Sequence, residues 1–255
     1  MLSTIKKTVV MFLAVAVFQA AAFACAQNAS AELWDTIQKN GVIVIGNSPD
    51  YPPYETMDGN IRVGFDIDIM NAMAPKMGIK IEWKTMSFDT IIAAVNMGNV
   101  DIGFSGFSVT EDRKKSVDFT IPYYSSGQVI VVRPGSSIKS GADLVGKKIG
   151  VQLGTTGQEA AEKIENAEVV KPETYSTAFM MLKSEAVEAV VADIPVAKEY
   201  AQKQGFVIAP EKLSYEENAI VVPKGNPKLV AALNKALSEI EKDGTLSEIV
   251  KKWMK

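Results

Sequence analysis

Short apolar runs alternate along the chain with longer segments in which apolar residues recur every three or four positions. The short runs predict buried strands at residues 42–45, 79–83, 102–104, 128–132, 148–153, 189–192 and 220–222. The longer segments predict helices, and the clearest of them begins at Pro227, repeats leucine or isoleucine along one face and ends at Gly244. Strands that alternate with helices in this way indicate an α/β fold.

One unit of the first half returns in the second half. A helix that begins at Phe88 leads into the apolar strand 102–104, and a similar helix that begins at Tyr175 leads into the strand 189–192. The match is approximate, but aromatic, apolar and acidic positions follow in the same order in both copies. The repetition therefore predicts two similarly built lobes, each a sheet flanked by helices.

The first lobe is expected to be discontinuous and to consist of residues 32–124 and 217–255, with residues 125–216 as the second lobe. An extended, proline-containing segment at 119–124 suits one crossing between the lobes, because the residue before a proline avoids the helical conformation. The weakly periodic segment 206–220 would hold the return crossing. The predicted fold class is α/β, with two lobes joined by two hinge crossings.

Residues 1–31 have the pattern of a secretory signal peptide. Two lysines precede an apolar stretch at residues 8–18, and an alanine-rich run follows. The apolar stretch is too short to span a bilayer. Cleavage after Ala31 or Ala26 fits the small-residue rule and favours a soluble periplasmic product. A weak lipoprotein motif precedes Cys25, so a lipid anchor at that residue is the alternative.

Composition excludes several classes of function. The chain carries 27 Lys and Arg against 30 Asp and Glu, and it contains 1 Cys and no His. Without the two leader lysines, 25 basic residues face 30 acidic ones, a net charge of −5 that argues against a nucleic acid partner. The missing histidine, and a cysteine confined to the leader, exclude Ser-His-Asp triads, cysteine nucleophiles, histidine-ligated metals and disulfides. We expect neither a cofactor nor a metal.

The candidate chemistry starts directly after the strand at 102–104. Ser105, Gly106 and Ser108 form a loop with little side-chain bulk, and Thr110 suits the N-cap of a short helix. Arg113 falls in the first turn of that helix, where the helix dipole disfavours a cation. A residue that breaks a local rule is expected where function overrides stability. One interpretation is a carboxylate receptor beside free backbone N–H groups; the other is a surface arginine paired with a neighbouring acid.

The second half offers another strand–loop–helix start, at Gly154, Thr155 and Thr156. Thr156 and Glu159 would form a capping box, so ordinary capping and an anion-binding helix start are both open. Asp193 ends the apolar strand of the repeated unit. A buried aspartate in that place would meet either a helix N-terminus or a cation such as a ligand ammonium.

Aromatic residues accompany these charged candidates. The proline-rich loop at 47–54 presents Tyr51 and Tyr54, either as walls of a ligand site or as plugs at the edge of the core. Asp66 and Asp68 are interpreted as charges at a helix N-terminus and not as a catalytic pair. A cation, an anion and apolar walls within one site describe the binding of a free α-amino acid.

At these residues the chain resembles the family 3 extracellular solute-binding proteins, the polar amino acid receptors of ABC importers. The similar segments are Tyr51–Tyr54, Gly64–Ile69, Ser105–Arg113, Gly154–Thr156, Asp193 and Gly244–Trp253. The resemblance covers essentially the whole mature chain, and it implies the two-lobed periplasmic-binding-protein fold of type II. It implies that Arg113 holds the ligand carboxylate, helped by backbone N–H groups of Ser108 and Thr156. It also implies that Asp193 and the backbone carbonyl of Ser105 bind the α-ammonium.

The resemblance further implies that Tyr51 and Phe88 enclose the ligand side chain. Several members with cationic or amide ligands carry an aspartate where this chain has Ser48, so a polar or neutral L-amino acid is expected here. The protein would be a monomer that opens and closes at its hinge and docks on a membrane ABC permease. The predicted ligand-binding residues are Tyr51, Phe88, Ser105, Gly106, Ser108, Arg113, Thr155, Thr156 and Asp193.

Two other functions remain open at this point. A periplasmic enzyme similar to cyclohexadienyl dehydratase would use the same scaffold and would need a general acid, for which Glu159 or Glu188 could be proposed. The chain could also be the ligand-sensing subunit of a signalling system with a separate partner chain. We predict the amino acid receptor, which is not an enzyme. Its ligand side chain would be bordered by Ser48, Asp50, Gln152 and Ala192.

Overall fold

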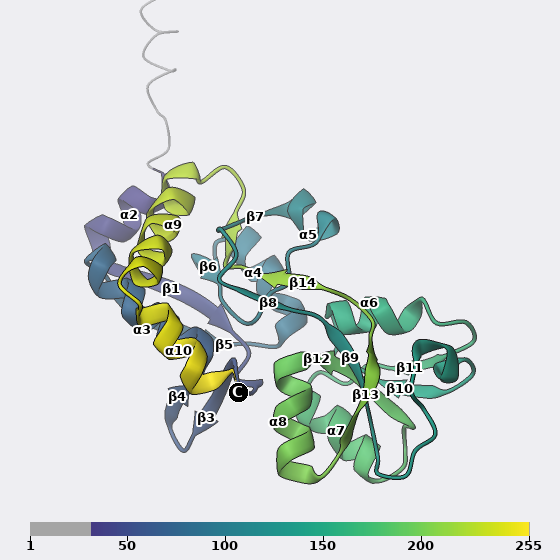
Figure 1. Cartoon of the computed structure of the whole chain (residues 1–255). Helices are drawn as coiled ribbons and strands as arrows, with labels where there is room; N and C mark the ends of the chain where they lie inside the picture. Colours follow the sequence, from purple (N-terminus) through teal and green to yellow (C-terminus); the bar gives the residue numbers. More distant parts are fainter. Residues whose placement is uncertain (1–31, 255) are drawn as a thin grey trace, which may run out of the picture.

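Two five-stranded sheets organise the chain (Figure 1). The computed structural model describes residues 32–254, so the predicted signal peptide and Cys25 lie outside the described residues. The first sheet has the strand order β5-β1-β6-β15-β7, and the second has the order β11-β10-β12-β9-β13. We call each sheet, together with the helices that pack against it, the first lobe and the second lobe.

The first lobe is built from both ends of the described chain. Its strands are β1 (Val42–Asn47), β5 (Lys80–Thr85), β6 (Ile102–Gly103), β7 (Val117–Phe119) and β15 (Val221–Pro223). Its helices are α2 (Leu33–Asn40), α3 (Phe65–Met77), η1 (Phe88–Thr90), α4 (Ile91–Asn96), α5 (Glu111–Ser116), α9 (Pro227–Lys242) and α10 (Thr245–Trp253). β1 pairs in parallel with β5 and β6, and β15 runs antiparallel to β6 and β7. A three-stranded sheet of β2 (Asp50–Tyr51), β3 (Glu55–Asp58) and β4 (Ile61–Val63) carries Tyr51.

The second lobe repeats this plan with fewer helices. Its strands are β9 (Gln128–Val132), β10 (Lys148–Gly150), β11 (Glu168–Val170), β12 (Ala189–Asp193) and β13 (Val207–Lys212). Its helices are η2 (Gly141–Leu144), α6 (Thr156–Glu162), α7 (Tyr175–Lys183) and α8 (Ile194–Gln204). β9 and β12 are buried along their whole length, as expected for strands covered on both faces. β10 pairs in parallel with β11 and β12, while β9 runs antiparallel to β12 and β13.

The chain passes between the lobes twice. β8 (Tyr124–Ser126) leads from the first lobe to the second, and β14 (Glu216–Asn218) leads back. The two strands pair antiparallel and run side by side between the lobes in Figure 1. The predicted lobe boundaries, at 124/125 and 216/217, fall in these two strands. Among residues 32–254, no helix is both long enough and apolar enough to cross a membrane.

Candidate functional site

Predicted site residues from the two halves of the chain meet where the lobes touch. The Tyr51 hydroxyl of the first lobe donates a hydrogen bond to Asp193 Oδ2 of the second lobe. Arg113 Nη2 donates to the carbonyl oxygen of Gly154 at 3.0 Å. The predicted cation and the predicted carboxylate therefore lie in one region. We call it the interlobe contact; it comprises Asp50, Tyr51 and Arg113 of the first lobe and Gln152, Gly154, Tyr175 and Asp193 of the second.

Arg113 is a buried cation held by backbone carbonyls. Thr110 caps helix α5, as predicted, because its Oγ1 accepts a hydrogen bond from Arg113 N at 3.1 Å. The arginine residue is 8% exposed, and its Nη1 donates to the Ser108 carbonyl oxygen at 2.8 Å. Burial lowers the pKa of Arg113, with Glu159 opposing that shift. An arginine keeps its charge in such a place, since its pKa starts above the physiological range.

The alternative of a surface arginine paired with an acid of its own helix is wrong. Glu111 and Asp112 pair instead with Lys114 and Lys115, at 2.7 and 3.0 Å. Among residues 32–254, no carboxylate oxygen lies within 4.0 Å of a guanidinium nitrogen of Arg113. A guanidinium has five N–H groups, and the two carbonyl contacts leave donors unused. Those donors suit a carboxylate, which arginine can bind with two parallel hydrogen bonds.

The aromatic candidates stack on rings that the sequence analysis did not pair with them. Tyr51 lies between Tyr54 and Tyr175, with ring centroids 5.1 and 5.2 Å apart. Phe88 stacks on Phe107 at 4.5 Å, and both rings lie within 5.6 Å of the Arg113 guanidinium carbon. The hydroxyl of Tyr51 is bound to Asp193, which turns its ring toward the second lobe. Enclosure of a ligand by Tyr51 and Phe88 stays a prediction.

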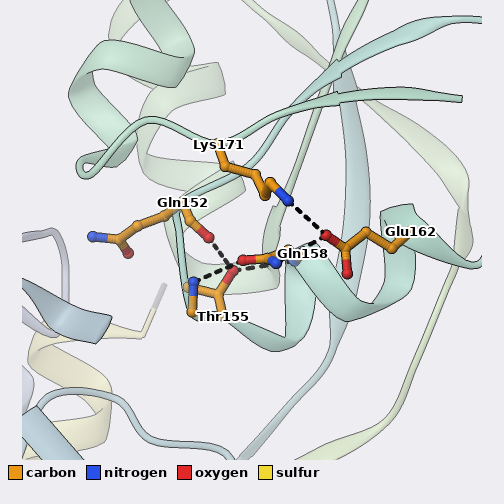
Figure 2. Close-up of polar contacts among 6 residues, drawn as sticks. Gln152, Thr155, Gln158, Glu162 and Lys171 are labelled. Atoms are coloured by element: carbon orange, nitrogen blue, oxygen red, sulfur yellow. Dashed lines mark hydrogen bonds and ion pairs between the residues drawn. The ribbon is translucent and has the colours of Figure 1, made fainter. Parts of the chain in front are cut away.

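The start of helix α6 differs from the prediction by one residue. Thr155, and not Thr156, is the N-cap, and its Oγ1 accepts a hydrogen bond from Gln158 N at 3.2 Å (Figure 2). The predicted capping box of Thr156 and Glu159 is therefore wrong. Gly154 adopts a positive φ of 79°, which turns the chain so that Thr155 takes the extended conformation of a cap. Thr155 Oγ1 also donates to the Gln152 carbonyl oxygen at 2.7 Å.

Thr156 connects helix α6 to the return crossing. Its Oγ1 donates to Glu216 Oε2 at 2.7 Å and accepts from Gln128 Nε2 at 3.1 Å. Glu216 lies in β14, so the first turn of α6 is attached directly to the strand that leads back to the first lobe. Thr156 is the first residue of α6, so its backbone N–H group has no acceptor within that helix.

Asp193 is a buried carboxylate that does not cap a helix. It ends β12 and directly precedes α8, but no hydrogen bond joins its side chain to that helix. Its carboxylate accepts from Tyr51 and, at 3.3 Å, from Ser126 Oγ. Burial, and then the negative charge of Glu216, raise the pKa of Asp193 to about 6. Of the two interpretations of Asp193, the capping interaction is not formed. Binding of a cation such as a ligand ammonium stays a prediction.

Two buried acids, Glu55 and Asp66, accept hydrogen bonds from the loop of Ser105 and Gly106. Ser105 Oγ donates to Glu55 and accepts from Ser48 N at 3.1 Å. Gly106 N donates to Asp66 Oδ2 at 2.7 Å. Burial raises the pKa of Glu55 well above its usual value and that of Asp66 to about 7. These contacts fix the loop, so that its carbonyl groups keep one direction.

Asp66 and Asp68 both lie in the first turn of α3, as predicted, but the Asp66 carboxylate also has partners outside that helix. Its carboxylate is turned into the protein, where Tyr123 OH donates to Oδ2 at 3.0 Å in addition to Gly106 N. Asp66 is fully buried, so it is not a solvated charge at the helix end. Asp68 points outward and pairs with Lys252 at 2.7 Å.

Sequence reasoning missed three residues that contact the predicted site. Tyr175 joins the ring stack, and Gln128 and Glu216 bind Thr156. The repeated unit could have identified Tyr175, because it is the counterpart of Phe88. No sequence pattern marks Gln128 or Glu216, since strand pairing alone brings them near α6. Among residues 32–254, no group of three His, Cys, Asp or Glu side chains could hold a metal ion.

Comparison with known proteins identifies the family. Residues 43–255 match the model of the bacterial extracellular solute-binding proteins, family 3. The chain belongs to this family. The resemblance inferred from the sequence motifs is thereby confirmed. The α/β fold class is confirmed as well, because the solved structures of similar chains have the two-lobed type II periplasmic-binding-protein fold.

Similar family 3 proteins bind amino acids. The chain is 35% identical over 218 residues to the arginine-binding extracellular protein ArtP of Bacillus subtilis (strain 168), covering 83% of this chain and 85% of ArtP. A solved structure of an ancestral arginine-binding protein bound to arginine is 44% identical, with a TM-score of 0.81, and covers 84% of this chain and 99% of the other. The ancestral amino acid-binding protein AncCDT-1, a precursor of cyclohexadienyl dehydratase, is 37% identical with a TM-score of 0.83, covering 87% and 99%.

Proposed function

We propose that this chain is an extracytoplasmic receptor that binds a free amino acid between its two lobes and delivers it to an ABC import permease. One observation carries the proposal. A buried cation of the first lobe, Arg113, and a buried carboxylate of the second, Asp193, lie in the same interlobe contact. A free α-amino acid carries the complementary pair of charges a few ångströms apart.

Each end of the ligand has its own group of residues. Arg113, with backbone N–H groups of Ser108 and Thr156, takes the α-carboxylate. Asp193, with the carbonyl oxygen of Ser105, takes the α-ammonium. Charge-assisted hydrogen bonds contribute about 1.5–3 kcal/mol each. After the loss of translational and rotational freedom, affinity in the micromolar range, about −8 kcal/mol, is expected.

The remaining predicted residues shape the space around the ligand. Tyr51 and Phe88 are its walls, Gly106 lets the loop come close to Tyr51, and Thr155 holds the start of α6. Ser48 taken alone favours a polar or neutral L-amino acid. Function follows from hinge motion at β8 and β14, in a monomer with lobes 32–124 plus 217–255 and 125–216. Because each lobe holds half of the charged groups, ligand binding favours the closed form.

The decisive test is binding of free amino acids to the mature protein. We expect calorimetry to find at least one L-α-amino acid that binds, and Arg113→Ala to weaken that binding by a hundredfold or more, as expected for loss of a charge-assisted bidentate pair. Lys114→Ala is the matched control, because Lys114 is an exposed cation on the same helix. A parent protein that binds no amino acid, or an Arg113→Ala variant as tight as the parent, would disprove the receptor.

We also propose that the receptor is periplasmic, exported by its signal peptide, and is not an enzyme. AncCDT-1 makes a dehydratase the alternative to test. Glu188 is a poor general acid, because bonds from Lys148 N and Lys147 lower its pKa. Purified protein incubated with prephenate or arogenate should form no aromatic product by ultraviolet absorbance. Formation of an aromatic product would disprove the proposal that the protein is not an enzyme.

A further inference from the structure

A third carboxylate lies in the interlobe contact, on Asp50 of β2. Its Oδ2 accepts a hydrogen bond from Tyr175 N at 3.1 Å, and its Oδ1 accepts from Ser48 Oγ at 3.0 Å and from Gln152 Nε2 at 3.5 Å. Tyr175 and Gln152 belong to the second lobe, so Asp50 reaches across the contact. All three donors are uncharged. A carboxylate offers about four acceptor positions, which leaves room for a further donor.

The interlobe contact has more negative charge than a zwitterion can balance. The α-carboxylate and α-ammonium of an amino acid would be matched by Arg113 and Asp193. Asp50 then remains, together with Glu216, whose carboxylate is bound to the Thr156 hydroxyl. Burial raises the pKa of Asp50, because its charge is partly removed from water without a cation among its hydrogen-bond partners. A cation beside this carboxylate would relieve that penalty.

Tyr175, whose backbone N–H group binds Asp50, also carries a buried acceptor without a donor. Among residues 32–254, Gln128 Oε1 and the Tyr175 hydroxyl oxygen are buried atoms without a hydrogen-bond partner. Both lie beside Gly157 of α6, at 2.9 and 3.2 Å from the position that a Cβ atom would take there. The Tyr175 ring stacks on Tyr51, the residue next to Asp50 in the chain. An unused acceptor and stacked aromatic rings on the residues that neighbour Asp50 suit a ligand with several N–H donors, such as a guanidinium.

We propose that Asp50 binds the positively charged side chain of the ligand, and that the receptor selects cationic amino acids. The inference rests on the proposed function and adds its substrate class. Asp50 directly precedes Tyr51, and each of the two residues contacts the second lobe: Asp50 binds Tyr175 N, and the Tyr51 hydroxyl binds Asp193. A side chain that extends from the α-carbon toward Gln152 and the start of α7 reaches Asp50.

Asp50 also changes the expectation drawn from Ser48. An uncharged residue at position 48 predicts a neutral ligand only if no other acid reaches the same place. The Ser48 hydroxyl donates to Asp50 Oδ1 at 3.0 Å, so a carboxylate lies directly beside it. The negative charge that is missing at residue 48 is present two residues later, on Asp50 of strand β2. Residue 48 is therefore neutral, but its surroundings are not.

The test compares ligands of similar length that differ in charge. The mature protein is titrated by calorimetry with arginine and citrulline, and with lysine and norleucine. We expect the cationic member to bind about ten- to a hundredfold more tightly in at least one pair, the ratio expected for one charge-assisted hydrogen bond. Asp50→Asn should reduce that ratio to within about threefold of unity. Asp112→Asn, which neutralises an exposed acid of α5, is the matched control and should keep the ratio.

The outcomes separate this inference from the receptor itself. If the uncharged member of both pairs binds as tightly as the cationic one, or if Asp50→Asn keeps the parent's ratio, the assignment of Asp50 is overturned while amino acid binding still supports the receptor. If no amino acid binds, both are overturned. Thermal unfolding of each variant verifies its fold. The parent ratios alone decide the substrate class if Asp50→Asn does not fold.

Discussion

Two of the residues proposed to bind the ligand, Arg113 and Asp193, are buried charged groups that form no ion pair with another residue of 32–254. Arg113 is held by two backbone carbonyls, and Asp193 by two hydroxyls. Charge burial of this kind destabilises a fold unless something compensates it. A zwitterion between the two lobes would supply charges of the opposite sign to both groups. The proposed site would therefore bind its ligand at a cost in the stability of the unliganded protein.

Asp193 makes ligand affinity dependent on pH. Its pKa is raised from 3.8 to about 6, so the carboxylate gains a proton as the pH falls through 6 and can no longer attract an ammonium. At pH 5 about one tenth of the groups is ionised, and we expect affinity roughly tenfold weaker than at pH 7.5. Calorimetry at both pH values measures the change. Asp193→Asn should bind weakly at both, and equal parent affinities at pH 5 and 7.5 would contradict the role of Asp193.

At the scale of elements, the loops that follow buried strands hold the site. Ser105 follows β6 in the chain, Thr155 lies in the segment between β10 and α6, and Asp193 is the last residue of β12. Gly106 shows how tightly one of these loops is packed. It has a φ of +60°, and a Cβ atom there would lie 2.8 Å from Tyr51 Cε1. Gly59 has nearly the same φ, +59°, but its Cβ would meet nothing within 4 Å.

This pair of glycines separates backbone strain from a steric clash. Gly59→Ala should lower the free energy of unfolding by about 1 kcal/mol, which is the penalty of the left-handed conformation for alanine. Gly106→Ala should lower it further and should also weaken ligand binding, because Tyr51 must move away from Asp193. Urea unfolding and calorimetry provide the two measurements. Equal effects of the two substitutions would show that Tyr51 has room to adjust.

Much of this element order could be predicted from the sequence, for physical reasons. Apolar runs predict β9 and β12 because strands buried on both faces are largely apolar, and only Gln128 and Asp193 at their ends are polar. Thr110 predicts the start of α5 because its side chain binds a local backbone N–H group. The cap of α6 was missed by one residue, since the positive φ of Gly154 is not visible in the sequence.

Residues of the candidate site could be predicted where neighbours in the sequence mark them. They could not be predicted where their contacts come from residues far away in the chain. Arg113 could be identified because a cation in a first helical turn breaks a local rule. The contacts of Asp66 and Glu216 could not be predicted, because their partners lie at least 40 residues away, on Gly106 and Thr156. The sequence predicts that Asp50 borders the ligand side chain. Its contact with Tyr175 could not be predicted, because it depends on how the lobes meet.

At the scale of the whole molecule, buried acids make stability dependent on pH. The pKa of Asp66 rises from 3.8 to about 7 on folding, so the folded state binds more protons than the unfolded state between these values. The free energy of unfolding should therefore fall as the pH rises from 4 to 7 and then level off. Asp193 and Glu55 act with the same sign, because burial raises their pKa values too.

Asp66→Asn isolates the contribution of one acid. The variant should lose part of the decline in unfolding free energy between pH 5 and pH 7.5, on the order of 2 kcal/mol for a shift of this size. Urea unfolding at the two pH values measures the difference. Asp112→Asn, an exposed acid, should leave the decline unchanged. A variant with the full decline of the parent would mean that Asp66 is ionised in the folded protein throughout this range.

The double crossing at β8 and β14 has a practical consequence. α2 and α10, the first and last helices of the described chain, both pack in the first lobe, and the second lobe is connected to it by β8 and β14 (Figure 1). A chip surface, fluorophore or fusion partner attached at either end would immobilise or report on only one half of the molecule. The second lobe would remain unattached and could still move about β8 and β14.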